Sequence, residues 1–118
     1  MTQAKSGGRH GERRAHTRKI VELPVLVHEA GNRVRGALRF DAQDLSLGGA
    51  FLRSDLLFEI GEELELEFQV PSGAVVRVRS RVVRVARDAG PAEAGMGIAF
   101  VDLAEADARA VRAFISGG

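Results

Sequence analysis

The chain has 118 residues, 45% apolar and 28% charged, so we expect one compact domain with a filled core. It contains no Cys, Trp or Tyr, which excludes a disulfide framework, a Cys-ligated zinc site and a thiol nucleophile. The lack of Trp and Tyr also argues against an aromatic platform for single-stranded nucleic acid. No apolar stretch approaches the roughly 20 residues that span a bilayer, and the first residues lack the apolar segment of a secretory signal. We therefore expect a cytoplasmic protein.

Charge is distributed unevenly along the chain, although the net charge is only +1. Residues 1–19 hold six Lys and Arg against one Glu, whereas the remaining residues hold eleven basic and fifteen acidic side chains. A basic segment ahead of a slightly acidic body predicts an anionic partner for that segment.

Residues 1–11, rich in Gly, Ser and charge, are expected to be a disordered tail before a single domain at 12–118. Within that domain, short alternating runs separated by turn signals predict antiparallel β-structure, in a small barrel or a sandwich. The expected strands lie near 20–29, 33–43, 49–54, 62–70, 74–87 and 95–101.

One hairpin can be predicted in register from the segments EELELEFQV and AVVRVRSRV. A Pro-Ser-Gly loop with Gly73 in the left-handed conformation would pair Val70 with Ala74. Opposite charges then face each other across the ladder, in the pairs Glu67–Arg77, Glu65–Arg79 and Glu63–Arg81. This register assigns the arginine stripe to the sheet's own stability rather than to a nucleic-acid surface.

The segment 102–116 is predicted to be a helix. Asp102 followed by Glu105 has the spacing of a capping box. An apolar stripe that can close one side of the sheet is formed by Leu103, Ala106, Ala110, Val111 and Phe114. A partner-binding helix is the alternative.

No familiar catalytic constellation is present in the sequence. Walker A, G-x-G-x-x-G and H-E-x-x-H motifs are absent. His10 and His16 precede the first strand and His28 falls on it, which gives neither a metal-ligand set nor a base for a Ser-His-Asp arrangement. We expect a protein that is not an enzyme, with no cofactor and no metal.

The segment DLSLGG, residues 44–49, carries chemistry suited to a ligand. In an extended chain Asp44 and Ser46 project from one face, and Gly48 and Gly49 would turn the backbone and leave bare amides beside a ligand. A carboxylate can accept two bonds from the N1–H and N2–H edge of guanine, and a hydroxyl can bond a phosphate or a base. A plain β-turn is the alternative, since Asp, Ser and Gly are common turn residues.

The basic segment ERRAHTRKI contains Arg14 and Arg18 in an R-x-x-x-R pair. The spacing alone is not informative, because three further pairs have it: Arg9/Arg13, Arg35/Arg39 and Arg77/Arg81. Only the pair at 14 and 18 lies directly before the first strand and is followed 26 residues later by DLSLGG.

These two motifs, in this order, resemble the PilZ domain family. That family carries R-x-x-x-R on an N-terminal arm and [D/N]-x-S-x-x-G between its second and third strands. GMGIAF at 95–100, followed by a terminal helix, is similar to the family's last strand and helix. The resemblance covers roughly residues 12–116 and implies a six-stranded β-barrel, with the arm at 12–19, the barrel at 20–101 and the helix at 102–116.

The resemblance also implies a ligand, the bacterial second messenger cyclic di-GMP. Arg14 and Arg18 would bind its phosphates or guanines, because a guanidinium forms paired hydrogen bonds and also stacks on bases. Asp44 would take a guanine edge, Ser46 would add a hydrogen bond, and Gly48 and Gly49 would leave room. In the family, the residue before the arginine pair, here Arg13, favours an intercalated ligand dimer.

Simple alternation raises one conflict with this assignment. It places Asp44 and Ser46 on the same face as Val34, Leu38 and Phe40. If those three point inward, a bulge or the end of the strand must turn the motif outward.

The sequence leaves three hypotheses about the function of this chain. The first is a cyclic di-GMP receptor whose arm becomes ordered on the barrel and creates a surface for a protein partner. The second is a PilZ-like protein–protein adaptor with a silent nucleotide site, and the third is a nucleic-acid-binding module that uses the basic arm. No membrane partner is expected.

Overall fold

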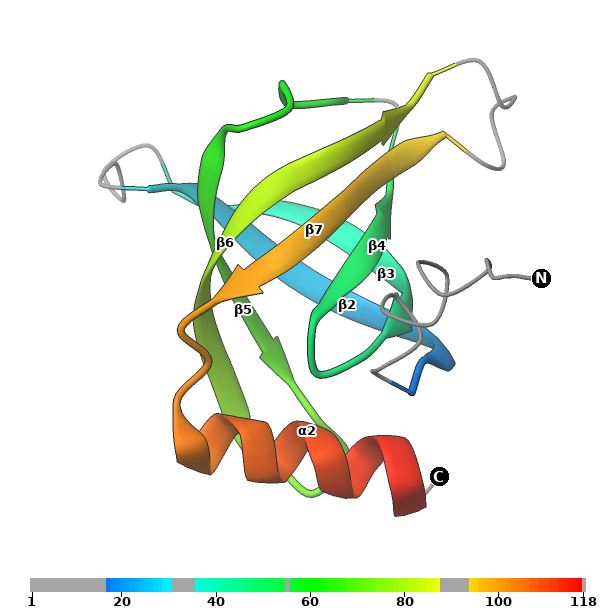
Figure 1. The fold of residues 1–118 in the computed structure, drawn as a ribbon, viewed down its shortest axis with the longest axis vertical. Helices are drawn as coiled ribbons and strands as arrows, with labels where there is room; N and C mark the ends of the chain where they lie inside the picture. Colours follow the sequence, from blue (N-terminus) through cyan, green and yellow to red (C-terminus); the bar gives the residue numbers. More distant parts are fainter. Residues whose placement is uncertain (1–16, 31–35, 55, 88–93, 118) are drawn as a thin grey trace, which may run out of the picture.

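The computed structural model describes residues 17–30, 36–54, 56–87 and 94–117. Six antiparallel strands form a closed barrel in the order β2-β3-β4-β7-β6-β5, and β5 pairs back with β2 (Figure 1). The strands are β2 (Lys19–Glu29), β3 (Leu38–Leu45), β4 (Gly49–Arg53), β5 (Glu63–Gln69), β6 (Val75–Ala86) and β7 (Gly95–Val101). The expected all-β barrel with a terminal helix is confirmed, while the expected tail at 1–11 and the arm as far as residue 16 lie outside the described residues.

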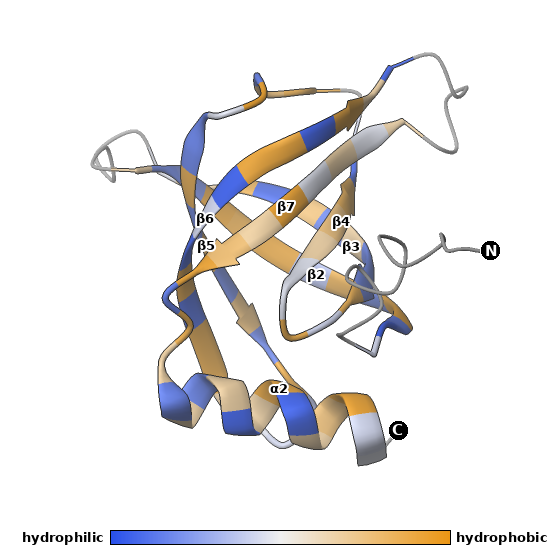
Figure 2. Cartoon of the chain, in the orientation of Figure 1, coloured by the Kyte–Doolittle hydropathy of each residue, from blue (hydrophilic) through white to orange (hydrophobic). Residues whose placement is uncertain are grey.

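Alternate residues of β5 and of most of β6 point into the barrel interior, and Figure 2 shows the matching alternation of apolar and polar residues along these two strands. On β2 the inward residues are Leu23, Val25 and Val27, with exposures of 9%, 1% and 1%. Burying each aliphatic side chain contributes about 1.5–3 kcal/mol, so the barrel wall is stabilised mainly from its inner face. Its outer face is therefore available for polar chemistry.

The β5–β6 hairpin has the predicted register. The Val70 amide donates to the Ala74 carbonyl at 3.0 Å, and Gly73 has a φ of +99°. The three Glu–Arg pairs face each other as expected, and ion pairs close at 3.1 Å for Arg77–Glu67 and 3.0 Å for Arg81–Glu63. The arginine stripe on β6 thus belongs largely to this ladder.

The terminal helix α2 (Glu105–Gly117) lies across one end of the barrel (Figure 1). Val111 is fully buried, and Leu103, Ala110 and Phe114 pack on the core, as the apolar stripe predicted. Ala106 is exposed, so its place in that stripe was wrong.

The predicted cap of α2 was also wrong. The Ala104 carbonyl accepts the first helical bond from the Ala108 amide at 2.8 Å, so Ala104 occupies the N-cap position. Asp102 instead has a φ of +59°, a left-handed conformation that Asp tolerates better than most residues. It turns the chain out of β7 two residues before the helix cap.

The predicted strand 33–43 was placed too early. Its first three residues lie outside the described residues, and β3 begins at Leu38, after Gly36 with a φ of +81°. The strand continues to Leu45, two residues beyond the predicted end. Asp44 is therefore a strand residue rather than part of the turn.

Candidate ligand-binding site

A β-bulge places Asp44 on the outer wall of the barrel. Between β3 and β4, Ala42 pairs with Leu52 and Asp44 pairs with Phe51, so Gln43 is an extra residue on β3. Ala42 and Leu45 are both 1% exposed and point inward, and the bulge between them reverses the alternation. The bulge resolves the conflict for Asp44, which no longer points inward with Phe40 and Ala42. Ser46 remains buried, Leu38 is 46% exposed, and Val34 lies outside the described residues.

The Asp44 carboxylate joins the two sequence motifs. Its Oδ1 accepts a bond from the Phe51 amide at 3.1 Å, and its Oδ2 accepts one from Arg18 Nη1 at 3.3 Å. The Asp44 side chain is 15% exposed, whereas that of Arg18 is 58% exposed. The backbone bond thus fixes the orientation of the carboxylate, which retains lone pairs for a further donor.

Ser46 shapes the loop between β3 and β4. Its hydroxyl oxygen accepts bonds from the amides of Gly48 and Gly49 at 3.1 and 3.2 Å, and the hydroxyl donates to the Gly49 carbonyl at 3.4 Å. Ser46 is only 6% exposed. The expectation of bare glycine amides was wrong, because Ser46 already occupies both.

Gly49 is required by strand packing. A Cβ at this position would lie 1.9 Å from the Ile98 carbonyl oxygen on the neighbouring strand β7. Since neither Gly48 nor Gly49 has a positive φ, the backbone freedom of glycine is not what this loop uses. The close approach of β4 to β7 explains why residue 49 lacks a side chain.

Two residues that the sequence interpretation did not single out lie beside Asp44 on the outer barrel wall. Phe51, paired with Asp44, is 9% exposed but lies outside the main core cluster. The Arg84 guanidinium lies over its ring, 5.3 Å from the centroid. The available signal was GMGIAF, in which Gly95 and Gly97 fall on the outer face and leave β7 without outward side chains there.

The structure brings together Arg18, Asp44, Ser46, Gly48 and Gly49 of the predicted site residues. Arg13 and Arg14 lie outside the described residues, as do His10 and His16. In the described part of the chain no group of three His, Asp or Glu side chains could hold a metal ion.

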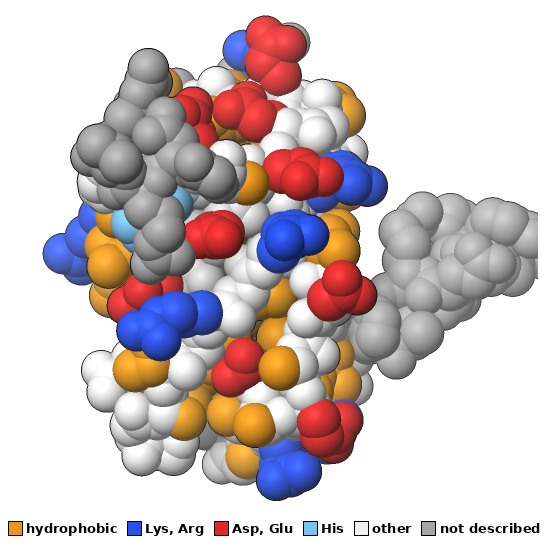
Figure 3. Space-filling view, turned by 90° about the vertical axis from the view of Figure 1, so that its left-hand side faces the viewer, with side chains coloured by type: hydrophobic (Ala, Val, Ile, Leu, Met, Phe, Trp, Pro, Cys, Tyr) orange, Lys and Arg blue, Asp and Glu red, His pale blue; other side chains and the backbone are white. Residues whose placement is uncertain are grey.

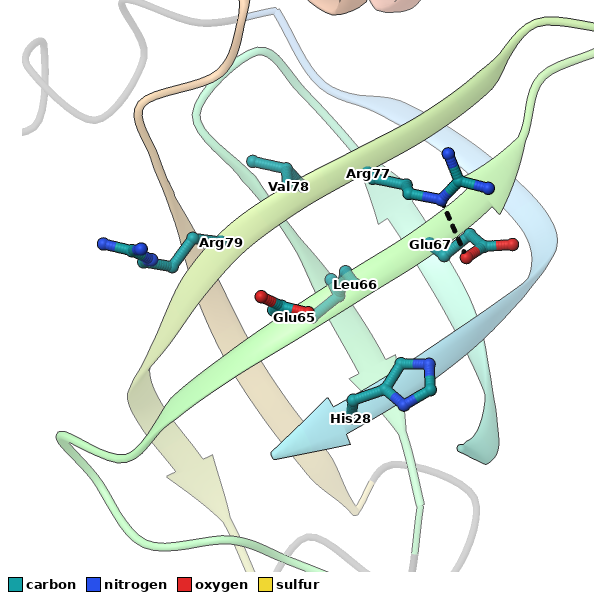
Figure 4. Close-up of a pocket in the computed structure, with 7 residues that line it drawn as sticks. All are labelled: His28, Glu65, Leu66, Glu67, Arg77, Val78 and Arg79. Atoms are coloured by element: carbon teal, nitrogen blue, oxygen red, sulfur yellow. Dashed lines mark hydrogen bonds and ion pairs between the residues drawn. The ribbon is translucent and has the colours of Figure 1, made fainter. Parts of the chain in front are cut away.

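A separate hollow of about 140 Å³ lies on the outer surface of β2, β5 and β6 (Figure 4). His28, Glu65, Glu67, Arg77 and Arg79 line it, and an ion pair joins Arg77 to Glu67. On the face in Figure 3, acidic and basic side chains are interspersed wherever the structure describes them. That pattern does not favour a phosphate backbone, which binds surfaces of one sign.

None of the helices that the structure describes is long and apolar enough to cross a membrane.

Comparison with known proteins gives a family and a set of folds. The model of the PilZ domain family matches residues 12–117. A search of curated proteins found no match.

Three solved structures illustrate the similarity of fold. The inhibitor of motility MotI/DgrA from Bacillus subtilis is 21% identical with a TM-score of 0.75, covering 89% of this chain and 50% of that one. The PilZ domain of YcgR from Escherichia coli, solved with c-di-GMP, is 18% identical with a TM-score of 0.65, covering 89% and 90%. The PilZ domain of CeSA from a cellulose-synthesizing bacterium is 16% identical with a TM-score of 0.61, covering 85% and 95%. The chain thus spans half of MotI but nearly all of the isolated PilZ domains.

Proposed function

Because this chain belongs to the PilZ domain family, we propose that it is a non-enzymatic receptor for cyclic di-GMP. The observation that carries the proposal is the contact between Arg18 and Asp44, 26 residues apart in the sequence. It joins the root of the basic arm to the DLSLGG motif on the outer barrel wall. YcgR, whose PilZ domain has a similar fold, was solved with the same ligand.

The chemistry of the site suits that ligand. Cyclic di-GMP offers two phosphates and two guanines, and the planar guanidinium of Arg18 can hydrogen-bond either group or stack on a base. Asp44, held by the Phe51 amide, would accept from a guanine N1–H and N2–H edge. Arg14 would add a second guanidinium from the arm.

Ser46, Gly48 and Gly49 act on the ligand through the shape of their loop. The three hydrogen bonds of the Ser46 hydroxyl fix the turn that follows Asp44. Loss of that turn would displace the carboxylate from the position in which it meets both the arm and the ligand.

Signal output would follow from ordering of the arm on the barrel wall. The root of the arm already contacts the terminal helix, since Lys19 Nζ lies 5.5 Å from the centroid of the Phe114 ring. A ligand that fixes Arg14 and Arg18 would therefore also fix the surface between the arm and α2. A protein partner that reads this surface would distinguish the bound state from the free state.

Isothermal titration calorimetry with cyclic di-GMP tests the proposal. The wild-type protein is expected to bind with micromolar or tighter affinity, and Arg14→Ala, Arg18→Ala and Ser46→Ala are each expected to weaken binding at least about tenfold. Arg77→Ala is the matched control, because it removes an arginine that the hairpin ladder holds. No binding by the wild-type protein would refute the proposal and leave an adaptor with a silent nucleotide site.

A further inference from the structure

One row of outward-facing residues crosses five strands of the barrel. Ile20 on β2 pairs with Asp44, Asp44 with Phe51 on β4, Phe51 with Gly97 on β7, and Gly97 with Arg84 on β6. Paired residues in antiparallel strands project from the same face of the sheet. The row therefore places Arg84 on the same outer wall as the Arg18–Asp44 contact. Arg84 lies at the β6 end of the row and Ile20 at the β2 end.

A second bulge turns Arg84 outward. Along β6 the inward residues are Val76, Val78, Ser80 and Val82, so uninterrupted alternation would direct residue 84 into the barrel. The pairing of β6 with β7 shifts between Val82 and Arg84, which makes Val83 the extra residue. Bulges re-aim side chains and are frequent beside functional sites. The two bulges have the same effect: the one at Gln43 places Asp44 on this row, and the one at Val83 places Arg84 on it.

The side chain of Arg84 extends over the outer surface of β7 to Phe51, because β7 has glycines and no outward side chains at residues 95 and 97. A Cβ on Gly97 would lie 3.2 Å from the Cβ of Arg84, and a Cβ on Gly95 would lie 2.7 Å from Cε2 of Phe51. Without these side chains, the Phe51 ring lies against β7 and the Arg84 guanidinium lies over that ring. The positive charge of Arg84 on β6 therefore lies over β4, the strand that pairs with Asp44.

We propose that Arg84 is a further ligand-binding residue, which stacks its guanidinium on the guanine base whose edge Asp44 binds. The guanidinium lies over one aromatic ring, and Arg84 is exposed, so its other face is accessible to a ligand. Guanidinium planes stack favourably on aromatic systems. Arg18 then approaches the ligand from the β2 side and Arg84 from the β4 side. This inference rests on the proposed function, and it adds a contact from the barrel itself to those from the arm.

Arg84 has a different partner from Arg77 and Arg81 on the same strand. Arg77 and Arg81 each bond a Glu on the facing strand β5. Arg84 lies beyond the end of the β5 ladder, which pairs only with residues as far as Arg81. Its guanidinium instead lies over Phe51, on the row that contains Asp44.

Calorimetric titration of two substitutions at residue 84 tests the inference. Arg84→Met keeps an unbranched apolar stem over Phe51 but removes the planar charge, and it is expected to weaken cyclic di-GMP binding about tenfold. Arg84→Lys keeps the charge without the plane and is expected to recover only part of that loss. Arg77→Ala should bind within about twofold of the wild-type protein, and thermal denaturation verifies that every variant is folded at the temperature of the titration.

The outcomes separate this inference from the proposed function. A wild-type protein that binds, together with Arg84→Met of unchanged affinity, would overturn the role of Arg84 and leave the receptor function intact. Full recovery by Arg84→Lys would overturn the stacking contact, since a point charge would then suffice. A wild-type protein that does not bind would overturn both.

Discussion

At the scale of single residues, the proposed site consists of side chains that the fold already holds in place without a ligand. Asp44 is oriented by a backbone amide, and Ser46 is buried and bonded within its own loop. In the proposed site their contribution would be preorganisation, which lowers the cost of ordering groups when a ligand binds. Substitutions at these positions should therefore alter stability as well as affinity.

Ser46→Ala is expected to lower the free energy of unfolding by about 1–3 kcal/mol, because it leaves the amides of Gly48 and Gly49 without their acceptor. Urea denaturation measures this quantity. Ser72→Ala is the matched control, since Ser72 bonds the Ala74 amide in an exposed turn. Equal losses in the two variants would contradict the structural role of Ser46.

Gly49→Ala is expected to destabilise the fold by more than about 2 kcal/mol, because its Cβ would overlap the Ile98 carbonyl oxygen and force β4 away from β7. The same denaturation experiment measures the loss. Gly117→Ala, with open space around the new methyl group, should be close to neutral. A Gly49→Ala protein as stable as the wild type would show that the two strands are not in close contact there.

At the scale of elements, the β5–β6 hairpin could be predicted from local sequence, whereas features that depend on pairing with distant strands could not. The β5–β6 register follows from alternation and one Pro-Ser-Gly loop, so the pairing of Glu67 with Arg77 could be derived from adjacent residues. The end of β3 depends on how β4 pairs with it, so the sequence could require a turn outward at Asp44 but could not place the bulge at Gln43. The position of Arg84 beside Asp44 could not be predicted from the sequence, because the two residues are related only through the pairing of several strands.

The ladder gives a prediction at this scale. Arg77→Glu is expected to destabilise the barrel by less than about 1 kcal/mol, because it places like charges opposite each other on an exposed surface. The double variant Glu67→Arg with Arg77→Glu should regain most of the loss. A double-mutant cycle by urea denaturation measures the coupling, and additive losses would refute the pairing.

At the scale of the whole molecule, the closed barrel would support a proposed site that is assembled from several strands. Closure leaves no unpaired sheet edge among the six strands, and α2 covers one end of the core (Figure 1). Strands β2, β3, β4, β6 and β7 each contribute to the row through Asp44, so any ligand on it would bind the barrel and not a separate loop. Binding should therefore stabilise the fold as a unit.

Cyclic di-GMP at about 100 times its dissociation constant is expected to add roughly 2.7 kcal/mol to the stability of the native state. For a chain of 118 residues the corresponding rise in Tm is roughly 10 °C. Differential scanning calorimetry measures the shift. Arg18→Ala at the same ligand concentration should show a much smaller rise, and an equal rise in both proteins would show that the ligand binds elsewhere.

The central claim, that the ligand lies on the outer row through Asp44, is tested most directly by mapping amide chemical shifts during a titration of the ¹⁵N-labelled protein with cyclic di-GMP. The account predicts that the largest changes occur at the amides of Asp44, Phe51 and Gly97, with small changes at Glu67 and Arg77 on the hairpin. Changes concentrated on the hairpin and His28, or no changes at saturating ligand, would contradict it.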